Sequence, residues 1–242
     1  MPIKIKINLT EKIQYSSFDE LLELDNYDDI QYLDCSHNNL TSLPRLPNSI
    51  EELNCNHNNL TSLPELPESL QHLFCNNNEL ISLPNLSPSL KGLHCNHNNL
   101  TSLPELPKSL YEIECYSNKI TLLPELPNLL IVICCDDNKI ISMPILPPSL
   151  EVLICDKNEI TSLPKLGNSL LELKCSHNKL ISLPQLPTSL QVIDCSNNLI
   201  TSLPIGINHL RNLHIFKCNN NKIENIPKHI IYYLESIKIL HK

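Results

Sequence analysis

Hydrophobic residues recur along most of this chain with a period of 20 residues. In the copy that begins at Leu90, apolar side chains stand at positions 1, 4, 6, 11, 14 and 17 of the period, and most positions between them are polar or proline. The register is strict from Ile30 to the copy that begins at Leu190, with cysteine at position 6 and asparagine at position 9 of every copy. A fixed period of this length indicates a stack of repeated units that share one continuous core.

Each unit is predicted to contain one short strand, at positions 2 to 6, that pairs in parallel with the strands of its neighbours. Alternation along a strand sends positions 4 and 6 into the core and leaves positions 3 and 5 exposed. The tail of the unit, such as residues 103–107, cannot form a helix, because proline fixes φ and holds the preceding residue in an extended conformation. We therefore predict a repeat solenoid with a parallel sheet on one side and an extended, polyproline-like segment on the other.

The two ends depart from the period. In residues 1–29, isoleucines and a leucine alternate with polar residues as in a strand, and Ser17 and Glu20 have the spacing of a helix capping box. We expect a strand and a short helix that together cap the first unit.

At the other end, the unit that begins at Leu190 has 23 residues, and the next unit begins at Leu213. Pro227 suits the first turn of a helix that we expect to run from about 228 to 240. The predicted organisation is an N-terminal cap over 1–29, about ten repeats over 30–226, and a C-terminal helical cap over 227–242.

The repeated pattern Leu-x-x-Leu-x-Cys-x-x-Asn-x-Leu resembles the leucine-rich repeat, with cysteine where leucine is commoner. The 20-residue length and the Leu-Pro-x-Leu-Pro tail resemble the short bacterial-effector subclass, and the bias toward cysteine and asparagine is similar to uncharacterised repeat proteins of large viruses that infect amoebae. The resemblance implies an α/β-type solenoid in the form of a leucine-rich-repeat horseshoe, with the parallel β-sheet on the concave face. It also implies that a protein partner binds this concave face.

The charge balance narrows the class of partner. The formal net charge is −8, which counts against nucleic acid and against an anionic membrane surface as ligands. No apolar run approaches the ~18 residues of a membrane-spanning helix, and residues 1–10 lack the apolar core of a signal peptide. We expect an intracellular protein, in the cytoplasm of its own or of a host cell, that is monomeric and has no cofactor. The scarcity of glycine, with 3 residues, and the absence of alanine indicate an AT-rich genome.

Ten of the 11 cysteines occupy position 6, where a thiol behaves as a small buried apolar group. Disulfides between neighbouring units are the less favoured alternative, because the torsions of a disulfide do not readily fit adjacent parallel strands. A column of buried thiols favours a reducing compartment. Cys134 is the exception, since position 5 is exposed, and it is a candidate reactive thiol.

The asparagine at position 9 is predicted to have a structural role. It stands where the chain turns away from the strand, and its amide can both donate to and accept from backbone groups of its own and of a neighbouring turn.

The exposed positions of the strands supply the candidate binding residues. An apolar cluster across two units consists of Val132, Cys134, Val152 and Ile154. It is interpreted either as a partner-binding surface or as tolerated exposure on a sheet that favours β-branched residues. A second candidate is Phe74 with His72 and His94, and a third, flanking group consists of Glu112, Glu114 and Tyr116.

Two further groups of residues are candidate cation sites. Position 8 carries His37, His57, His97 and His177, either as metal ligands or as polar turn residues. Asp136, Asp137 and Asp156 would either attract a cation or keep the surface soluble. In both cases we favour the second reading and assign no metal ligand.

The sequence carries no pairing of a nucleophile with a base and no glycine-rich phosphate loop, and few residues follow the last repeat. We therefore expect a non-catalytic protein-interaction module and assign no catalytic residue. The alternatives are a substrate-recognition adaptor for a host ubiquitin or signalling complex, and a structural or decoy repeat protein with no specific ligand.

Overall fold

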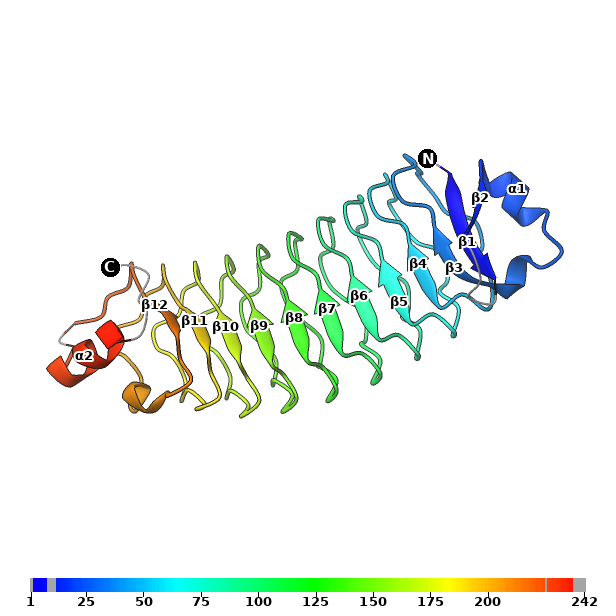
Figure 1. Cartoon of the computed structure of the whole chain (residues 1–242). Helices are drawn as coiled ribbons and strands as arrows, with labels where there is room; N and C mark the ends of the chain where they lie inside the picture. Colours follow the sequence, from blue (N-terminus) through cyan, green and yellow to red (C-terminus); the bar gives the residue numbers. More distant parts are fainter. Residues whose placement is uncertain (1, 8–11, 225, 237–242) are drawn as a thin grey trace. The chain divides into compact units, whose positions relative to one another are not determined.

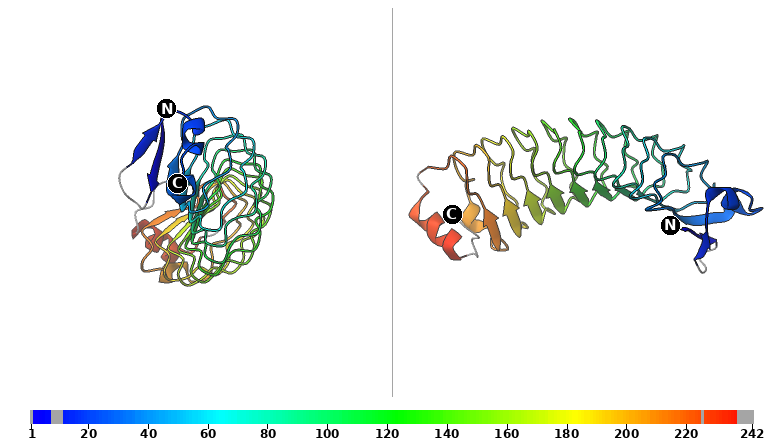
Figure 2. Two further views of the ribbon diagram at one scale, coloured as in Figure 1. Left: turned by 90° about the vertical axis from the view of Figure 1, so that its right-hand side faces the viewer. Right: turned by 90° about the horizontal axis from the view of Figure 1, so that it is seen from above.

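The structure is a computed structural model that describes residues 2–7, 12–224 and 226–236. The chain forms two compact units, Met1–Lys119 and Ile120–Lys242, which we describe one at a time. In each of them, the parallel strands of a repeat solenoid lie side by side along one face (Figure 1). The segments that connect the strands run across the remaining faces (Figure 2).

The first unit begins with a small cap. Strand β1 (Ile3–Ile7) pairs antiparallel on one side with β2 (Ile13–Tyr15) and on the other with β3 (Ile30–Asp34). Helix α1 (Phe18–Leu22) follows, and a 3₁₀ turn η1 (Tyr27–Asp29) leads into β3. The strand β2 is an element that the sequence analysis does not anticipate, and Leu9 of the expected first strand lies outside the described residues.

The start of α1 shows most of the expected capping box. The Ser17 side chain accepts a hydrogen bond from the backbone N–H of Glu20. The Glu20 carboxylate reaches back one residue further than expected, and accepts from the backbone N–H and the hydroxyl of Ser16. These two hydrogen bonds lower the pKa of Glu20 below its ordinary value.

From β3 onward the strands of the first unit pair in parallel and in register. They are β4 (Glu52–Asn54), β5 (His72–Phe74), β6 (Gly92–His94) and β7 (Glu112–Glu114). These strands span positions 3 to 5 and are shorter than the predicted five residues. Backbone bonding nevertheless continues on both sides, since the N–H of Gln71 donates to the carbonyl of Glu51 and the N–H of Cys75 donates to that of His94.

The strands of the second unit also pair in parallel and in register. Its strands are β8 (Val132–Cys134), β9 (Val152–Ile154), β10 (Glu172–Lys174), β11 (Val192–Asp194) and β12 (Ile215–Lys217). The longer repeat between β11 and β12 contains a 3₁₀ turn η2 (Ile207–His209), which Gly206 introduces with a φ of 83°.

Helix α2 (Lys228–Ser236) follows the last strand of the second unit. It buries Ile230 and Leu234, and the hydroxyl of Tyr233 donates to the carbonyl of Leu210 at 2.7 Å. Residues 237–240 of the expected helix lie outside the described residues.

The core is built from the repeated apolar positions. In the copy at Leu90, the side chains at positions 1, 4, 6 and 11 are fully buried. Position 6 forms a column of thiols whose burial raises the pKa of Cys35 to about 12 and raises the pKa of Cys55 and Cys75 well above the ordinary value. These cysteines are therefore protonated apolar core residues, as the sequence predicts.

The position-9 asparagines form the expected ladder. The Asn58 amide nitrogen donates to the carbonyls of Cys35 and Cys55, at 3.1 and 3.0 Å, and to that of Asn56. Its side-chain oxygen accepts the backbone N–H groups of Asn38 and Leu40, both at 3.0 Å. One side chain thus satisfies backbone groups of two neighbouring turns.

Position 8 has a conformational requirement that its residue types did not predict. Its residue has a positive φ, between 50° and 57°, in every unit: His37, His57, Asn77, His97, Ser117, Asp137, Lys157, His177, Asn197 and Asn220. Asn, Asp and His tolerate this left-handed conformation better than most residues. The histidines at position 8 therefore have a backbone explanation.

Candidate functional site on the exposed sheet face

Positions 3 and 5 of each strand lie on the face of the sheet that points away from the core. Most of these side chains are half-buried, because each is flanked by its counterparts on the neighbouring strands. Their identities change from strand to strand, whereas the residue between them is fully buried leucine or isoleucine in nearly every strand. The face is therefore where one repeat differs from the next.

In the first unit, the predicted group of Phe74, His72 and His94 comes together. Register places Phe74 opposite His94, and their rings stack with centroids 4.7 Å apart and planes 19° from parallel. The His72 ring lies 6.4 Å from that of Phe74 and also meets the edge of Tyr111, again at 6.4 Å. Three rings thus line the exposed face of β5 and β6.

Gly92 provides the space for this arrangement. It stands between His72 and Glu112 in the parallel register. A Cβ atom at Gly92 would lie 2.9 Å from His72 Nδ1 and 3.6 Å from His94 Nε2. Two imidazole rings therefore border the place that a side chain would fill. The position of Gly92 in the repeat did not predict that its lack of a side chain accommodates these rings.

Two members of the third predicted group adjoin these rings. The His94 Nδ1 atom lies 3.2 Å from Glu114 Oε2, and the Asn96 side-chain amide donates to the same oxygen at 3.0 Å. Glu112 lies two residues before Glu114 on the same face of β7. Tyr116 is oriented differently, since its ring meets the edge of His97 with centroids 5.1 Å apart.

In the second unit, the predicted apolar cluster forms as expected from register. Val132 pairs with Val152, and Cys134 pairs with Ile154. All four side chains are half-buried. Among the described strands of the repeats, β8 and β9 are the ones in which both exposed positions are apolar. We call these four residues the apolar patch.

Charged residues adjoin the apolar patch. The Lys174 ammonium lies 2.6 Å from the Glu172 carboxylate on the neighbouring strand β10, and this hydrogen bond raises the pKa of Lys174. Burial raises the pKa of Asp136 and of Asp156, which follow β8 and β9. Asp156 also accepts the backbone N–H of Ser176, so it has a structural role in its turn.

The predicted histidines at position 8 do not join the sheet face. His37 and His57 stack on each other in adjacent turns, with centroids 4.3 Å apart and planes 13° from parallel. Among the described residues, His94, Glu112 and Glu114 are the group in which three potential metal ligands come within reach of one another.

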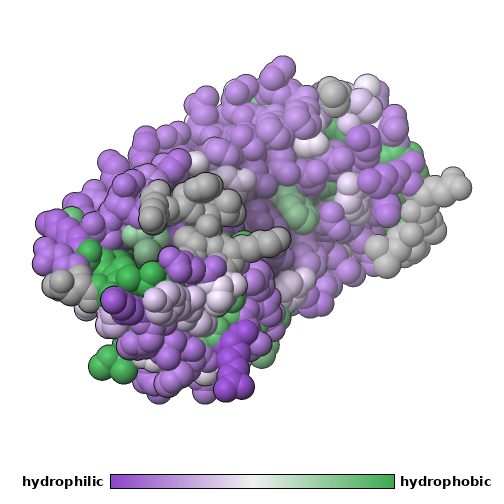
Figure 3. Space-filling view, turned by 60° about the vertical axis from the view of Figure 1, so that its left-hand side comes forward, coloured by the Kyte–Doolittle hydropathy of each residue, from purple (hydrophilic) through white to green (hydrophobic). Residues whose placement is uncertain are grey.

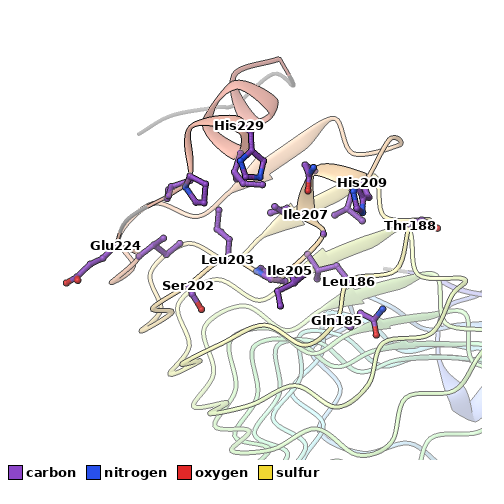
Figure 4. A pocket seen from close by; sticks show the side chains of 18 residues that line it. Gln185, Leu186, Thr188, Ser202, Leu203, Ile205, Ile207, His209, Glu224 and His229 are labelled. Atoms are coloured by element: carbon purple, nitrogen blue, oxygen red, sulfur yellow. The ribbon is translucent and has the colours of Figure 1, made fainter.

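A cavity of about 720 Å³ lies away from the sheet face, between the tails of the last repeats and α2 (Figure 4). Its apolar lining includes Leu186, Leu203, Ile205 and Ile207, and none of the predicted site residues reaches it. From the side that brings the C-terminal repeats forward, the surface is mostly hydrophilic with small hydrophobic groups (Figure 3). The repeat pattern did not predict this cavity. The 23-residue length of the unit that begins at Leu190 is the feature that could have indicated an irregular segment there. Neither of the described helices has the length and hydrophobicity that crossing a membrane requires.

Comparisons with known proteins agree with this architecture. A family model described as leucine-rich repeats (2 copies) matches residues 188–230. No curated protein sequence matches the chain.

Solved structures give longer matches. YopM from Yersinia enterocolitica WA-314 is 34% identical with a TM-score of 0.76, over 84% of this chain and 50% of that chain. This chain therefore spans half the length of YopM. The leucine-rich-repeat domain of a Shigella effector is 31% identical with a TM-score of 0.51, over 69% of each chain.

A third match bears on the cysteines. The functional domain of InlJ from Listeria monocytogenes, which is described as including a cysteine ladder, is 25% identical with a TM-score of 0.63, over 95% of this chain and 55% of that chain. None of these three proteins comes from a virus, so the expected similarity to viral repeat proteins stays a prediction.

Proposed function

The chain belongs to the leucine-rich repeat family, and from this premise we propose that it is a non-catalytic module that binds a protein partner on the exposed face of its sheet. The observation that carries this proposal is the apolar patch of the second unit. Each of the other described repeat strands carries a polar residue or glycine at one or both exposed positions. Apolar side chains gathered on a solvent-facing surface are typical of interaction sites.

The composition of the surface supports a protein as the partner. An apolar centre with a charged rim is the usual anatomy of a protein interface, and here the Glu172–Lys174 ion pair lies beside the patch. The net charge of −8 disfavours a nucleic acid or an anionic membrane as the ligand.

The protein belongs in a reducing compartment, where the buried thiols of the position-6 column stay reduced. The similarity to the leucine-rich-repeat domain of a Shigella effector supports an effector-like role. The finer alternative is a substrate-recognition adaptor for a host ubiquitin or signalling complex. The identity of the captured partner would test this alternative.

The proposal is tested by affinity capture from host-cell lysate with the double variant Val132→Glu/Ile154→Glu. The introduced carboxylates place charge at the centre of the patch, so a partner that binds there is lost. The matched control is Ile145→Glu/Ile181→Glu, because these isoleucines are 88% and 61% exposed and lie outside the sheet face. We expect capture by the wild type and by the control but not by the patch variant.

Two measurements make the result decisive. Thermal unfolding of all three proteins must agree, because loss of folding would imitate loss of binding. Crosslinking from a photoreactive residue at position 152 must reach the captured protein. Identical capture profiles for all three proteins would instead point to a structural repeat protein with no ligand on this patch.

A further inference from the structure

We propose that His94, Glu112 and Glu114 form a binding site for a divalent transition-metal ion of the Zn²⁺ class. One imidazole nitrogen and one carboxylate oxygen from each glutamate all lie within 4.8 Å of one another. The three side chains are half-buried, so the site is open to ions from solvent and partly shielded from it. This inference goes beyond the proposed protein partner, because these three residues belong to the first unit and the apolar patch belongs to the second.

The strand register creates the group. Parallel pairing of β6 with β7 sets His94 opposite Glu114 and Gly92 opposite Glu112. Since alternate residues of a strand point to one face, Glu112 and Glu114 project from β7 on the same side as His94. Three of the four exposed positions of this strand pair therefore carry a ligand, and the fourth carries no side chain.

Gly92 places no side chain against the His94 imidazole. A Cβ atom there would lie 3.6 Å from His94 Nε2, in ordinary van der Waals contact with the imidazole. Zinc sites with three protein ligands keep a fourth position for water or for a group from another molecule. His72 Nδ1 also borders this space, at 2.9 Å from the same point.

Neighbouring groups hold two of the ligands in place. Phe74 stacks on His94 and fixes the plane of the imidazole. The Asn96 amide donates to Glu114 Oε2 and orients that carboxylate. Such outer contacts set ligand geometry in metal sites and typically change metal affinity 10- to 100-fold.

A comparison within the chain separates this group from an ordinary ion pair. Strand β10 carries Glu172 and Lys174 at the same two positions, and there the carboxylate is neutralised by an ammonium group at 2.6 Å. On β7 both positions are glutamates, and the group facing Glu114 is an imidazole, which is itself a metal ligand. One nitrogen and two carboxylate oxygens suit Zn²⁺ and Co²⁺, whereas Ca²⁺ takes oxygen ligands.

The test is a titration of the purified full chain with ZnCl₂ by calorimetry and with CoCl₂ by visible absorption, in a reducing buffer without chelator. We expect one ion per chain and the intense visible bands of tetrahedral Co²⁺. His94→Gln and Glu112→Gln should each weaken binding more than about 100-fold, and Asn96→Ala about 10-fold.

Two matched variants locate the site. His57→Asn removes the stacked His37–His57 pair, and Asn77 shows that asparagine fits the same turn position. Glu172→Gln removes a glutamate from the same position of another strand. Both should bind as the wild type does.

Four results would contradict the metal site. Absence of one-to-one binding, unchanged affinity in His94→Gln, or loss of binding in His57→Asn would overturn the proposal. A thiolate charge-transfer band with Co²⁺ would place the ion on cysteine and would overturn it as well. Circular dichroism of every variant excludes unfolding as the cause of a loss.

Discussion

The turn that follows each strand and the exposed face of the strand lie only a few residues apart. Residue identity hardly changes from unit to unit at positions 6 and 9, whereas it changes from strand to strand on the exposed face. Cysteine at position 6 and asparagine at position 9 occur in every unit of the strict repeat. Positions 3 and 5 carry glutamate in one strand, valine and isoleucine in another, and histidine and phenylalanine in a third. The invariant residues maintain the stack, and the variable ones carry its recognition chemistry.

The reason lies in what each side chain contacts. Asn78 donates to the backbone carbonyls of Cys55 and Cys75 and accepts the backbone N–H of Leu60, so it joins two units through atoms that no substitution removes. A side chain such as His94 contacts mainly other exposed side chains, which can change together. A substitution in the turn should therefore cost stability, whereas one on the face should change binding.

The cysteine column gives the largest predicted effect, which is unfolding in alkali. Burial raises the pKa of Cys35 to about 12 and also raises the pKa of Cys75, Cys95 and Cys155 above the ordinary value of 9.0. Above pH 9 the unfolded chain loses thiol protons that the folded chain retains. Stability is therefore full below pH 9 and falls as the pH rises toward the folded-state values.

Several thiols titrate together, and each lowers the free energy of unfolding by about 1.4 kcal/mol per pH unit. Urea unfolding should be measured between pH 7 and 11 with a reductant present. We expect the free energy of unfolding to fall to near zero within about two pH units above pH 9. Cys75→Val removes one titrating group, so its slope should be smaller by about 1.4 kcal/mol per pH unit. Equal slopes would assign the transition to other groups, such as Tyr27, whose pKa burial also raises.

The asparagine ladder gives the second prediction. Asn58→Ala removes the partner of three backbone carbonyls and two backbone N–H groups in a side chain that is only 7% exposed. Unpaired buried backbone groups cost about 1 to 3 kcal/mol each, partly relieved by entry of water. We expect a loss of about 3 to 4 kcal/mol in the free energy of unfolding, measured with urea at pH 7.

The adjacent residue provides the control. Asn59 is exposed, and its backbone N–H donates to the carbonyl of Leu40, a bond that alanine retains. Asn59→Ala should change the free energy of unfolding by less than about 0.5 kcal/mol. If both variants lost a similar free energy of unfolding, the side-chain hydrogen bonds of the ladder would not be the cause of the loss in Asn58→Ala.

The periodic pattern predicted the parts of the fold that repeat. The core positions, the parallel strands, the cysteine column and the asparagine ladder all follow from residue type and spacing, because every copy has the same surroundings. The strand β2, by contrast, occurs once, and its residues Ile13–Tyr15 have no counterpart in the repeat. The left-handed turn at position 8 was also missed, because histidine, lysine and serine there mask a preference that asparagine alone would have revealed.

For the candidate site, the sequence predicted which residues lie on the exposed face but not how their side chains are oriented. Strand alternation identified the exposed residues, and register follows from the fixed period, so the pairing of Val132 with Val152 was expected. The approach of His72 and His94 to the space at Gly92 depends on side-chain rotamers, which the period does not determine. Tyr116 likewise turns toward His97 because both belong to turns and not to the strand face.

The smallest predicted effect compares two glycines, one in an irregular turn and one on the exposed face. Gly206 has a φ of 83°, which strains any residue with a Cβ atom, so Gly206→Ala should cost about 1 kcal/mol in the free energy of unfolding. At Gly92 the nearest obstacle to a Cβ atom is the imidazole of His72, the end of a side chain that can rotate away. Alanine also restricts the unfolded chain, which favours folding by about 0.4 to 1 kcal/mol. Gly92→Ala should therefore leave the urea midpoint nearly unchanged.

A larger loss of stability in Gly92→Ala than in Gly206→Ala would show that the face around His72 is as tightly constrained as the turns. That result would contradict the division between a fixed scaffold and a variable surface.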